Sequence, residues 1–163
     1  MTIWDLETPA LLVDLDRLKA NLKRVGSYGA EHDFRLRPHT KTHKTPDIGR
    51  MQLDRGAVGL TVAKVGEAEI MVSSGTPDIL VAYPVLGESK WARLMEVAKI
   101  LNVSVALDNL ESARGLSRYA SFAGVEIGIL VEADVGMRRC GLAPGDELTS
   151  LAQEITKISG LRL

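Results

Sequence analysis

The feature that most constrains this chain is a regular alternation of short apolar runs with amphipathic helical segments. We interpret the runs at residues 34–40, 58–63, 78–83, 103–108 and 125–134 as strands. Their starting points are 20 to 25 residues apart, and a helical pattern lies between each pair. This spacing is typical of βαβ units, which build parallel sheets. The sequence therefore predicts an α/β fold with a parallel sheet.

The expected helices carry apolar residues three and four positions apart, which places those residues on one helix face. The first begins after Asp14, a residue suited to capping a helix, and ends near residue 29. The others span 46–55, 65–74, 89–101, 110–122 and about 145–159. Glu67 and Glu69 fall at the start of the helix at 65–74, near the positive end of its dipole.

Two architectures fit this alternation, a doubly wound sheet and a (β/α)8 TIM barrel. No glycine-rich turn opens the first helix, which weakens the dinucleotide-binding version of the doubly wound sheet. A barrel needs about 250 residues, whereas this chain has 163, and residues 161–163 resemble the start of a sixth strand. We therefore expect residues 1–163 to be a partial barrel domain that supplies about the first five βα units.

The composition excludes several classes of function. Hydrophobic residues make up 45% and charged residues 25% of the chain, as in globular proteins. The net charge of −1 gives no overall attraction to nucleic acid or to an anionic membrane. The single cysteine, Cys140, fits a reducing compartment. With no membrane-length apolar run and no signal peptide at the N-terminus, we expect a cytoplasmic protein.

The octapeptide from Arg37 to Lys44 reads Arg-Pro-His-Thr-Lys-Thr-His-Lys and lies at the end of the first predicted strand. Strand alternation would place Arg35, Arg37, His39 and Lys41 on one face. Cationic neighbours favour the neutral form of a lysine amine, which can attack a carbonyl. The alternative is a row of solvent-exposed charges without a chemical role.

A second polar stretch, residues 132–141, follows the last predicted strand and reads Glu-Ala-Asp-Val-Gly-Met-Arg-Arg-Cys-Gly. Alternation directs Glu132 and Asp134 toward the interior of a barrel. The two glycines permit a tight loop, from which Arg138 or Arg139 would extend at the carboxyl end of the strand, where barrels carry their active sites. A guanidinium suits a phenolate, carboxylate or phosphate. Alternatively, these acids and arginines pair with one another in a structural turn.

Together the two stretches resemble the D-threonine aldolase and D-serine dehydratase family. These are pyridoxal-phosphate (PLP) enzymes whose barrel is of the alanine-racemase N-terminal type, also called fold type III. Residues 8–14, Thr-Pro-Ala-Leu-Leu-Val-Asp, and residues 59–63, Gly-Leu-Thr-Val-Ala, support the resemblance. It implies a (β/α)8 TIM barrel whose remaining strands and C-terminal β-domain lie outside residues 1–163.

The resemblance also implies roles for single residues. Lys41 would form the Schiff base with the cofactor, with Lys44 as the less favoured alternative. Arg139 would face the phenolic oxygen of PLP, and Arg138 would lie at the surface or the substrate's edge. His39 would line the site or orient Lys41, whereas the role of His43 stays open.

By resemblance, the function is that of a PLP-dependent lyase acting on small D-3-hydroxy amino acids, by retro-aldol cleavage or by loss of water. The resemblance implies a divalent metal, Zn or Mn, with ligands in a later segment that is not in this chain. We also expect a homodimer. The alternatives are a non-catalytic PLP-binding or homeostasis barrel, an inactive half-barrel fragment and an amino-acid racemase.

Overall fold

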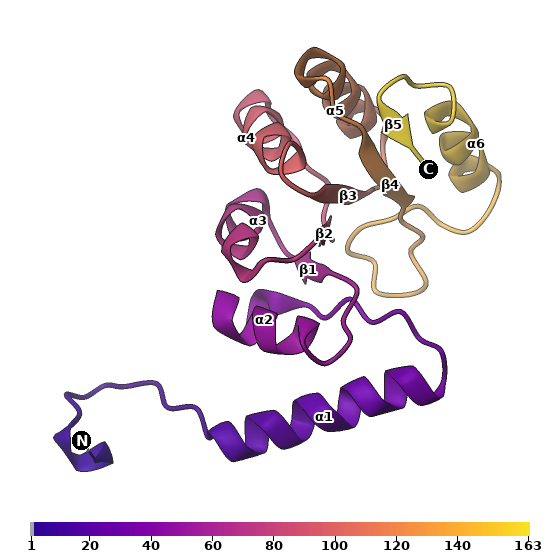
Figure 1. Cartoon of the computed structure of the whole chain (residues 1–163). Coiled ribbons are helices and arrows are strands. Elements are labelled where there is room, and N and C mark those ends of the chain that lie inside the picture. Colours follow the sequence, from indigo (N-terminus) through magenta and orange to yellow (C-terminus); the bar gives the residue numbers. More distant parts are fainter. Residues whose placement is uncertain (1) are drawn as a thin grey trace.

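A curved parallel sheet forms the centre of the computed structural model, which describes residues 2–163 (Figure 1). Its five strands are β1 (Leu60–Val62), β2 (Asp78–Val81), β3 (Asn102–Leu107), β4 (Ile127–Val131) and β5 (Leu161–Arg162). Each strand pairs in parallel with the next one along the chain. A doubly wound sheet would reverse its strand order at a switch point. The sequential order confirms the barrel prediction.

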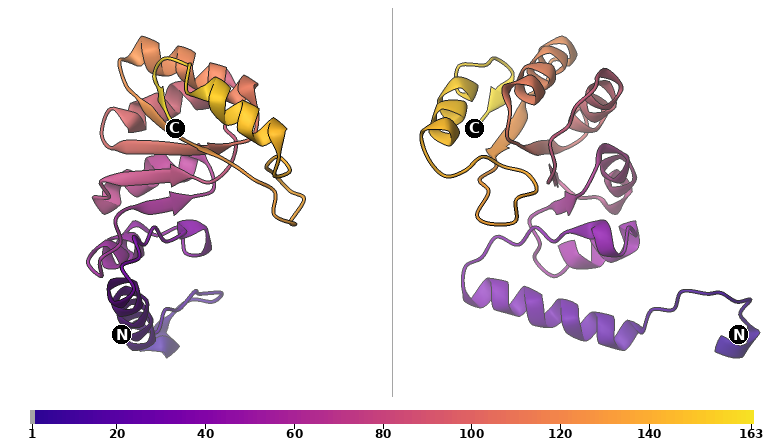
Figure 2. Two further views of the ribbon diagram at one scale, coloured as in Figure 1. Left: turned by 90° about the vertical axis from the view of Figure 1, so that its right-hand side faces the viewer. Right: turned by 180° about the vertical axis from the view of Figure 1, so that it is seen from behind.

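Two helices precede the first strand, and the later four connect the strands and lie along the outer side of the sheet (Figures 1 and 2). The helices are α1 (Leu15–Glu31), α2 (Pro46–Leu53), α3 (Val65–Met71), α4 (Glu88–Ala98), α5 (Leu110–Ala123) and α6 (Asp146–Ile155). Short 3-10 turns occupy η1 (Ile3–Asp5), η2 (Thr40–Thr42) and η3 (Val72–Ser74). Asp14 caps α1 as predicted, since its side chain accepts hydrogen bonds from the next helical amides. No helix within residues 2–163 has the length and apolar character needed to cross a membrane.

The hydrophobic core lies between the sheet and its helices. Alternate strand residues such as Leu60, Val62, Ile79 and Val81 are fully buried there. The intervening residues line the inner side of the curved sheet, because partners in a parallel ladder point the same way. Thr61, Leu80, Ser104, Gly128 and Arg162 form one such row across the five strands. The inner side is thus the more polar one.

The predicted strand at 34–40 is wrong as a hydrogen-bonded strand. This segment is extended beside β1, but it forms only one isolated bridge, between His39 and Thr61. Its carbonyl groups do accept bonds, from Val58 N to Leu36 O at 2.9 Å and from Thr61 N to Pro38 O at 2.8 Å. Pro38 has no amide hydrogen, so it cannot donate to a ladder.

The predicted cationic face of Arg35, Arg37, His39 and Lys41 is also wrong. Lys41 lies in η2, beyond the extended segment. Arg37 is half-buried, and its Nε lies 2.8 Å from Asp78 Oδ1, although the angles do not make a hydrogen bond. The ion pair therefore compensates the charge of Arg37 with an acid from the start of β2.

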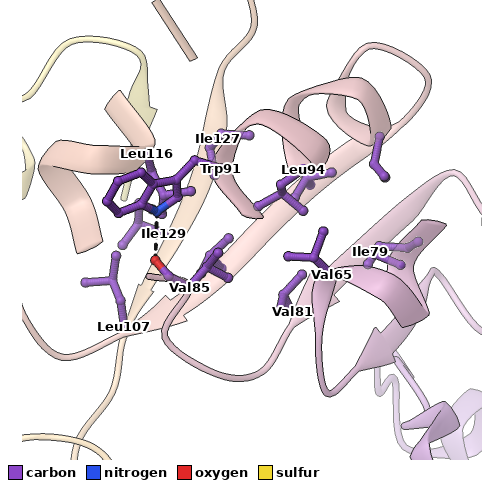
Figure 3. Packing of buried hydrophobic residues seen from close by; sticks show 14 of the residues in the cluster. Val65, Ile79, Val81, Val85, Trp91, Leu94, Leu107, Leu116, Ile127 and Ile129 are labelled. Atoms are coloured by element: carbon purple, nitrogen blue, oxygen red, sulfur yellow. Dashed lines mark hydrogen bonds between the residues drawn. The ribbon is translucent and has the colours of Figure 1, made fainter. Parts of the chain in front are cut away.

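Trp91 joins α4 to α5 and to the loop before α4 (Figure 3). Its Nε1 donates a 2.8 Å hydrogen bond to Val85 O, and its ring is buried beside Leu116. The ring packs directly on Gly115 of α5, where a Cβ atom would lie far inside van der Waals distance of the indole. Glycine is required here for close approach of the two helices.

We expect Gly115→Ala to destabilise the whole protein by about 1–3 kcal/mol, the usual cost of overpacking a core. The hydrogen bond of Trp91 restricts the movement that would relieve the clash. Gly66→Ala in α3 is the matched control, because the nearest side-chain atom to a Cβ there is Arg93 Nη2 at 3.5 Å. Urea unfolding should show the control at or above wild-type stability, since alanine favours a helix by up to about 1 kcal/mol. Equal stability of the two variants would contradict this account.

Candidate active site

The candidate site lies at the carboxyl ends of the strands, where parallel barrels place their catalytic groups. Two segments meet there, the turn η2 that carries Lys41 and the loop that follows β4. In the left view of Figure 2 the loop after β4 projects beyond the carboxyl ends of the strands. The sequence predicted both segments as site elements, and the structure places them at the same rim.

His39 lies on the inner side of the sheet, in register with Thr61. Its Nδ1 accepts a hydrogen bond from Lys41 N at 3.3 Å, which ties the histidine to the backbone of the turn. Burial lowers the pKa of His39, and the positive charges of Lys41 and Arg139 lower it further. The negative charge of Glu67 opposes them. The three predicted site residues His39, Lys41 and Arg139 therefore lie close enough to interact electrostatically.

The two candidate lysines differ in their surroundings. Lys41 is exposed at the rim and forms no ion pair within the described part of the chain. Lys44 donates from its Nζ to Oε1 of Glu67, a residue of α3 that is only 5% exposed. The amine of Lys44 is thus engaged by a buried carboxylate, whereas that of Lys41 has no such partner among the described residues. This geometry favours Lys41 over Lys44 as the reactive amine.

Glu67 is a residue whose position the sequence analysis described but whose contacts it missed. Its Oε2 accepts a hydrogen bond from Ala63 N at 2.8 Å. Burial would raise the pKa of Glu67, but the hydrogen bonds from Lys44 and Ala63 outweigh it and hold the pKa below its ordinary value. The first-turn position was visible in the sequence, whereas the partner, 23 residues away, was not.

The loop that carries Arg139 is held by hydrogen bonds from its backbone amides to two aspartate side chains. Asp134 Oδ1 accepts from Gly136 N and Arg138 N, each at 2.9 Å, and these bonds lower the pKa of Asp134. Gly141 N donates to Asp108 Oδ2 at 2.9 Å, which anchors the loop to the end of β3. Gly141 has φ +94°, and a Cβ there would lie 2.7 Å from Asp134 N. The predicted tight loop is confirmed.

The two carboxylates of this loop, Glu132 and Asp134, differ in their hydrogen bonding. Asp134 binds the backbone amides of Gly136 and Arg138, so it has a structural role in the turn, but the predicted alternative of pairing with the arginine side chains is wrong for this residue. Glu132 is half-buried, and its Oε2 is buried without a hydrogen-bond partner among residues 2–163. Burying a carboxylate oxygen without a hydrogen-bond partner costs free energy. This oxygen of Glu132 is therefore suited to accept a hydrogen bond from a further donor.

His43 lies between η2 and α2, where it contacts Thr45. Its Nδ1 accepts from Thr45 N at 3.1 Å, and its carbonyl oxygen accepts from Thr45 Oγ1 at 2.7 Å. Burial lowers the pKa of His43, and the hydrogen bond from Thr45 N opposes this shift. In the part of the chain that the structure describes, no group of three or more His, Cys, Asp or Glu residues could hold a metal.

Known proteins are similar to this chain in fold and in sequence over nearly its whole length. A D-threonine aldolase of Arthrobacter sp. is 38% identical over 156 residues, covering 96% of this chain and 41% of the relative. The crystal structure of D-threonine aldolase from Filomicrobium marinum superposes with a TM-score of 0.95 at 38% identity, over 99% of this chain and 44% of that one. The structure of D-threo-3-hydroxyaspartate dehydratase from Delftia sp. HT23 superposes with a TM-score of 0.83 at 29% identity. The match covers 98% of this chain and 42% of that one.

This chain spans about 40% of the length of the relatives that it matches. The family described as alanine racemase, N-terminal domain, matches residues 13–163, which include all the strands and the rim with Lys41 and Arg139. The sequential parallel sheet and this match agree, and the chain belongs to the alanine racemase N-terminal domain family.

Proposed function

We propose that the whole protein is a PLP-dependent lyase that acts on small D-3-hydroxy amino acids, as an aldolase or a dehydratase. The observation that carries this proposal is the exposed amine of Lys41 beside His39, at the rim that also carries Arg139. The names of the relatives support it, since they include both aldolases and dehydratases of D-amino acids. These names favour a lyase over the racemase and the non-catalytic alternatives.

The residues present fit PLP. A lysine amine condenses with an aldehyde, and a guanidinium pairs with an anionic oxygen. Lys41 would take the first role and Arg139 the second, whereas the amine of Lys44 is engaged by Glu67. In other barrels the loops after the last strands hold a phosphate group, so we expect the phosphate site in a later segment.

When bound, PLP withdraws electrons from the bond that is broken in the amino acid. Lys41 would hold the cofactor and then accept or donate a proton at its Nζ. His39 would orient the turn through its bond to Lys41 N, and its lowered pKa keeps its ring neutral and able to accept this bond. Arg139 would favour the anionic form of a phenolic oxygen.

Several predictions from the sequence stay proposals. A divalent metal, Zn or Mn, would polarise the β-hydroxyl of the substrate, with ligands from a later segment. The homodimer, the cytoplasmic location and the extension of residues 1–163 into a complete barrel with a C-terminal β-domain are proposals as well. The choice between retro-aldol cleavage and dehydration depends on that later segment.

We expect borohydride treatment of the whole protein with PLP to leave a covalent adduct on Lys41, detected by peptide mass spectrometry. Lys41→Ala should lose the adduct and at least about 10³-fold of kcat, because no other amine in the turn is free of an ion pair. Lys44→Ala is the control and should still be labelled at Lys41. Labelling of Lys44 in the wild-type protein would contradict the assignment.

We expect the cofactor-free protein to lose stability as the pH falls from about 7 to about 5.5, because His39 becomes protonated more readily in the unfolded state than in the folded state. Because its folded pKa lies below the unfolded value of about 6.5, the unfolded state binds more protons in this range. Stability therefore rises with pH across this window. His39→Gln should reduce the difference in urea midpoint between the two pH values. His32→Gln, at the exposed end of α1, should retain the wild-type difference; the same reduction in both variants would exclude a specific effect of His39.

A further inference from the structure

We propose that Glu67 is a positioning residue, which places Lys41 by joining the end of its turn to the end of β1. This inference rests on the proposed function, because it assumes that the placement of the Lys41 amine matters. Glu67 is buried in α3 and uses both carboxylate oxygens. One accepts from Lys44 Nζ and the other from Ala63 N, the residue that directly follows β1.

The turn that carries Lys41 is closed at Lys44. Both His43 N and Lys44 N donate to Thr40 O, at 3.2 and 2.8 Å. Lys44 also has φ +51°, a left-handed conformation that a residue with a side chain rarely adopts. Glycine would adopt it without strain, but glycine could not contact Glu67. The ion pair of Lys44 with Glu67 therefore offsets the free-energy cost of the left-handed backbone conformation that ends the turn.

Lys41 is held from two sides by this arrangement. On one side Thr40 is fully buried, and its Oγ1 donates to Thr61 O at 3.2 Å. On the other side Lys44 binds Glu67. Lys41 lies between these two anchors, and both connect it to β1. Removal of Glu67 leaves the Thr40 anchor in place, so we expect the turn to loosen without unfolding of the barrel.

The same helix offers a matched control. Glu69 lies two residues after Glu67 on another face of α3, where it forms an exposed ion pair with Arg93 of α4. Glu69 Oε1 accepts from Arg93 Nε at 2.7 Å. Glu69→Gln and Glu67→Gln therefore change the same chemical group on the same helix. Only the Glu67 change touches the Lys41 turn.

The first measurement needs no cofactor. Hydrogen–deuterium exchange of the cofactor-free whole protein should show faster exchange of the amides of His43 and Lys44 in Glu67→Gln, with exchange in β3 unchanged. Glu69→Gln should match the wild type. If exchange in the turn of Glu67→Gln equals that of wild type, the proposal is overturned.

The second measurement uses the PLP-loaded enzyme. Glu67→Gln should lower kcat by about 10- to 100-fold, because a misplacement of about 1 Å can cost about 100-fold. Lys44→Met should cause a similar loss, the double variant should be no worse than either single one, and Lys44→Arg should retain most of the activity. Wild-type kcat in Glu67→Gln would overturn the proposal, and so would additive losses in the double variant.

The two proposals fail in different ways. Absence of a borohydride-trapped adduct on Lys41 in the wild-type protein would remove the proposed lyase. The exchange measurement alone would then decide whether Glu67 holds the turn. Faster exchange confined to Glu67→Gln supports the positioning role, and unchanged exchange removes it.

Discussion

Burial of one side of the parallel sheet under its helices is the constraint on which the rest of this structure depends. Residues such as Leu60, Ile79, Val105 and Ile127 are fully buried. Because each strand pairs with the next in sequence, right-handed crossovers place the connecting helices on the same side. The sheet therefore curves with its helices outside (Figure 2). Its inner side and the carboxyl ends of its strands stay available for polar side chains.

The rim owes its geometry to polar contacts with the backbone. Thr40 and Glu67 connect the Lys41 turn to β1, through Thr61 O and Ala63 N. Asp108 connects the Arg139 loop to β3. Thr40 and Glu67 bind backbone groups of the β1 region, whereas Asp108, directly after β3, binds a backbone amide of the loop. Strand ends are held rigidly by the core, so these bonds transfer that rigidity to segments that would otherwise be mobile.

Much of the site could be predicted from local sequence. The loop at 132–141 was recognisable because glycines and acids at these positions favour a tight turn, and Gly141 and Asp134 do form one. The choice between Lys41 and Lys44 was less accessible. Both belong to the same short cationic string. The family resemblance favours Lys41, but the contact that distinguishes the two amines, the ion pair of Lys44 with Glu67, appears only in the structure. That pair joins residues from different βα units.

The sequence by itself determined the alternation of strands and helices, since periodicity and helix caps act over a few residues. Only the tertiary structure decided how the segment at 34–40 joins the sheet, because Pro38 lacks an amide donor while the carbonyl groups of Leu36 and Pro38 still accept bonds from Val58 N and Thr61 N. It also decided that Lys44 is engaged and that Asp108 anchors Gly141, 33 residues away. Contacts between distant residues leave no local pattern, because they form only when packing of the core brings the strand ends to one rim.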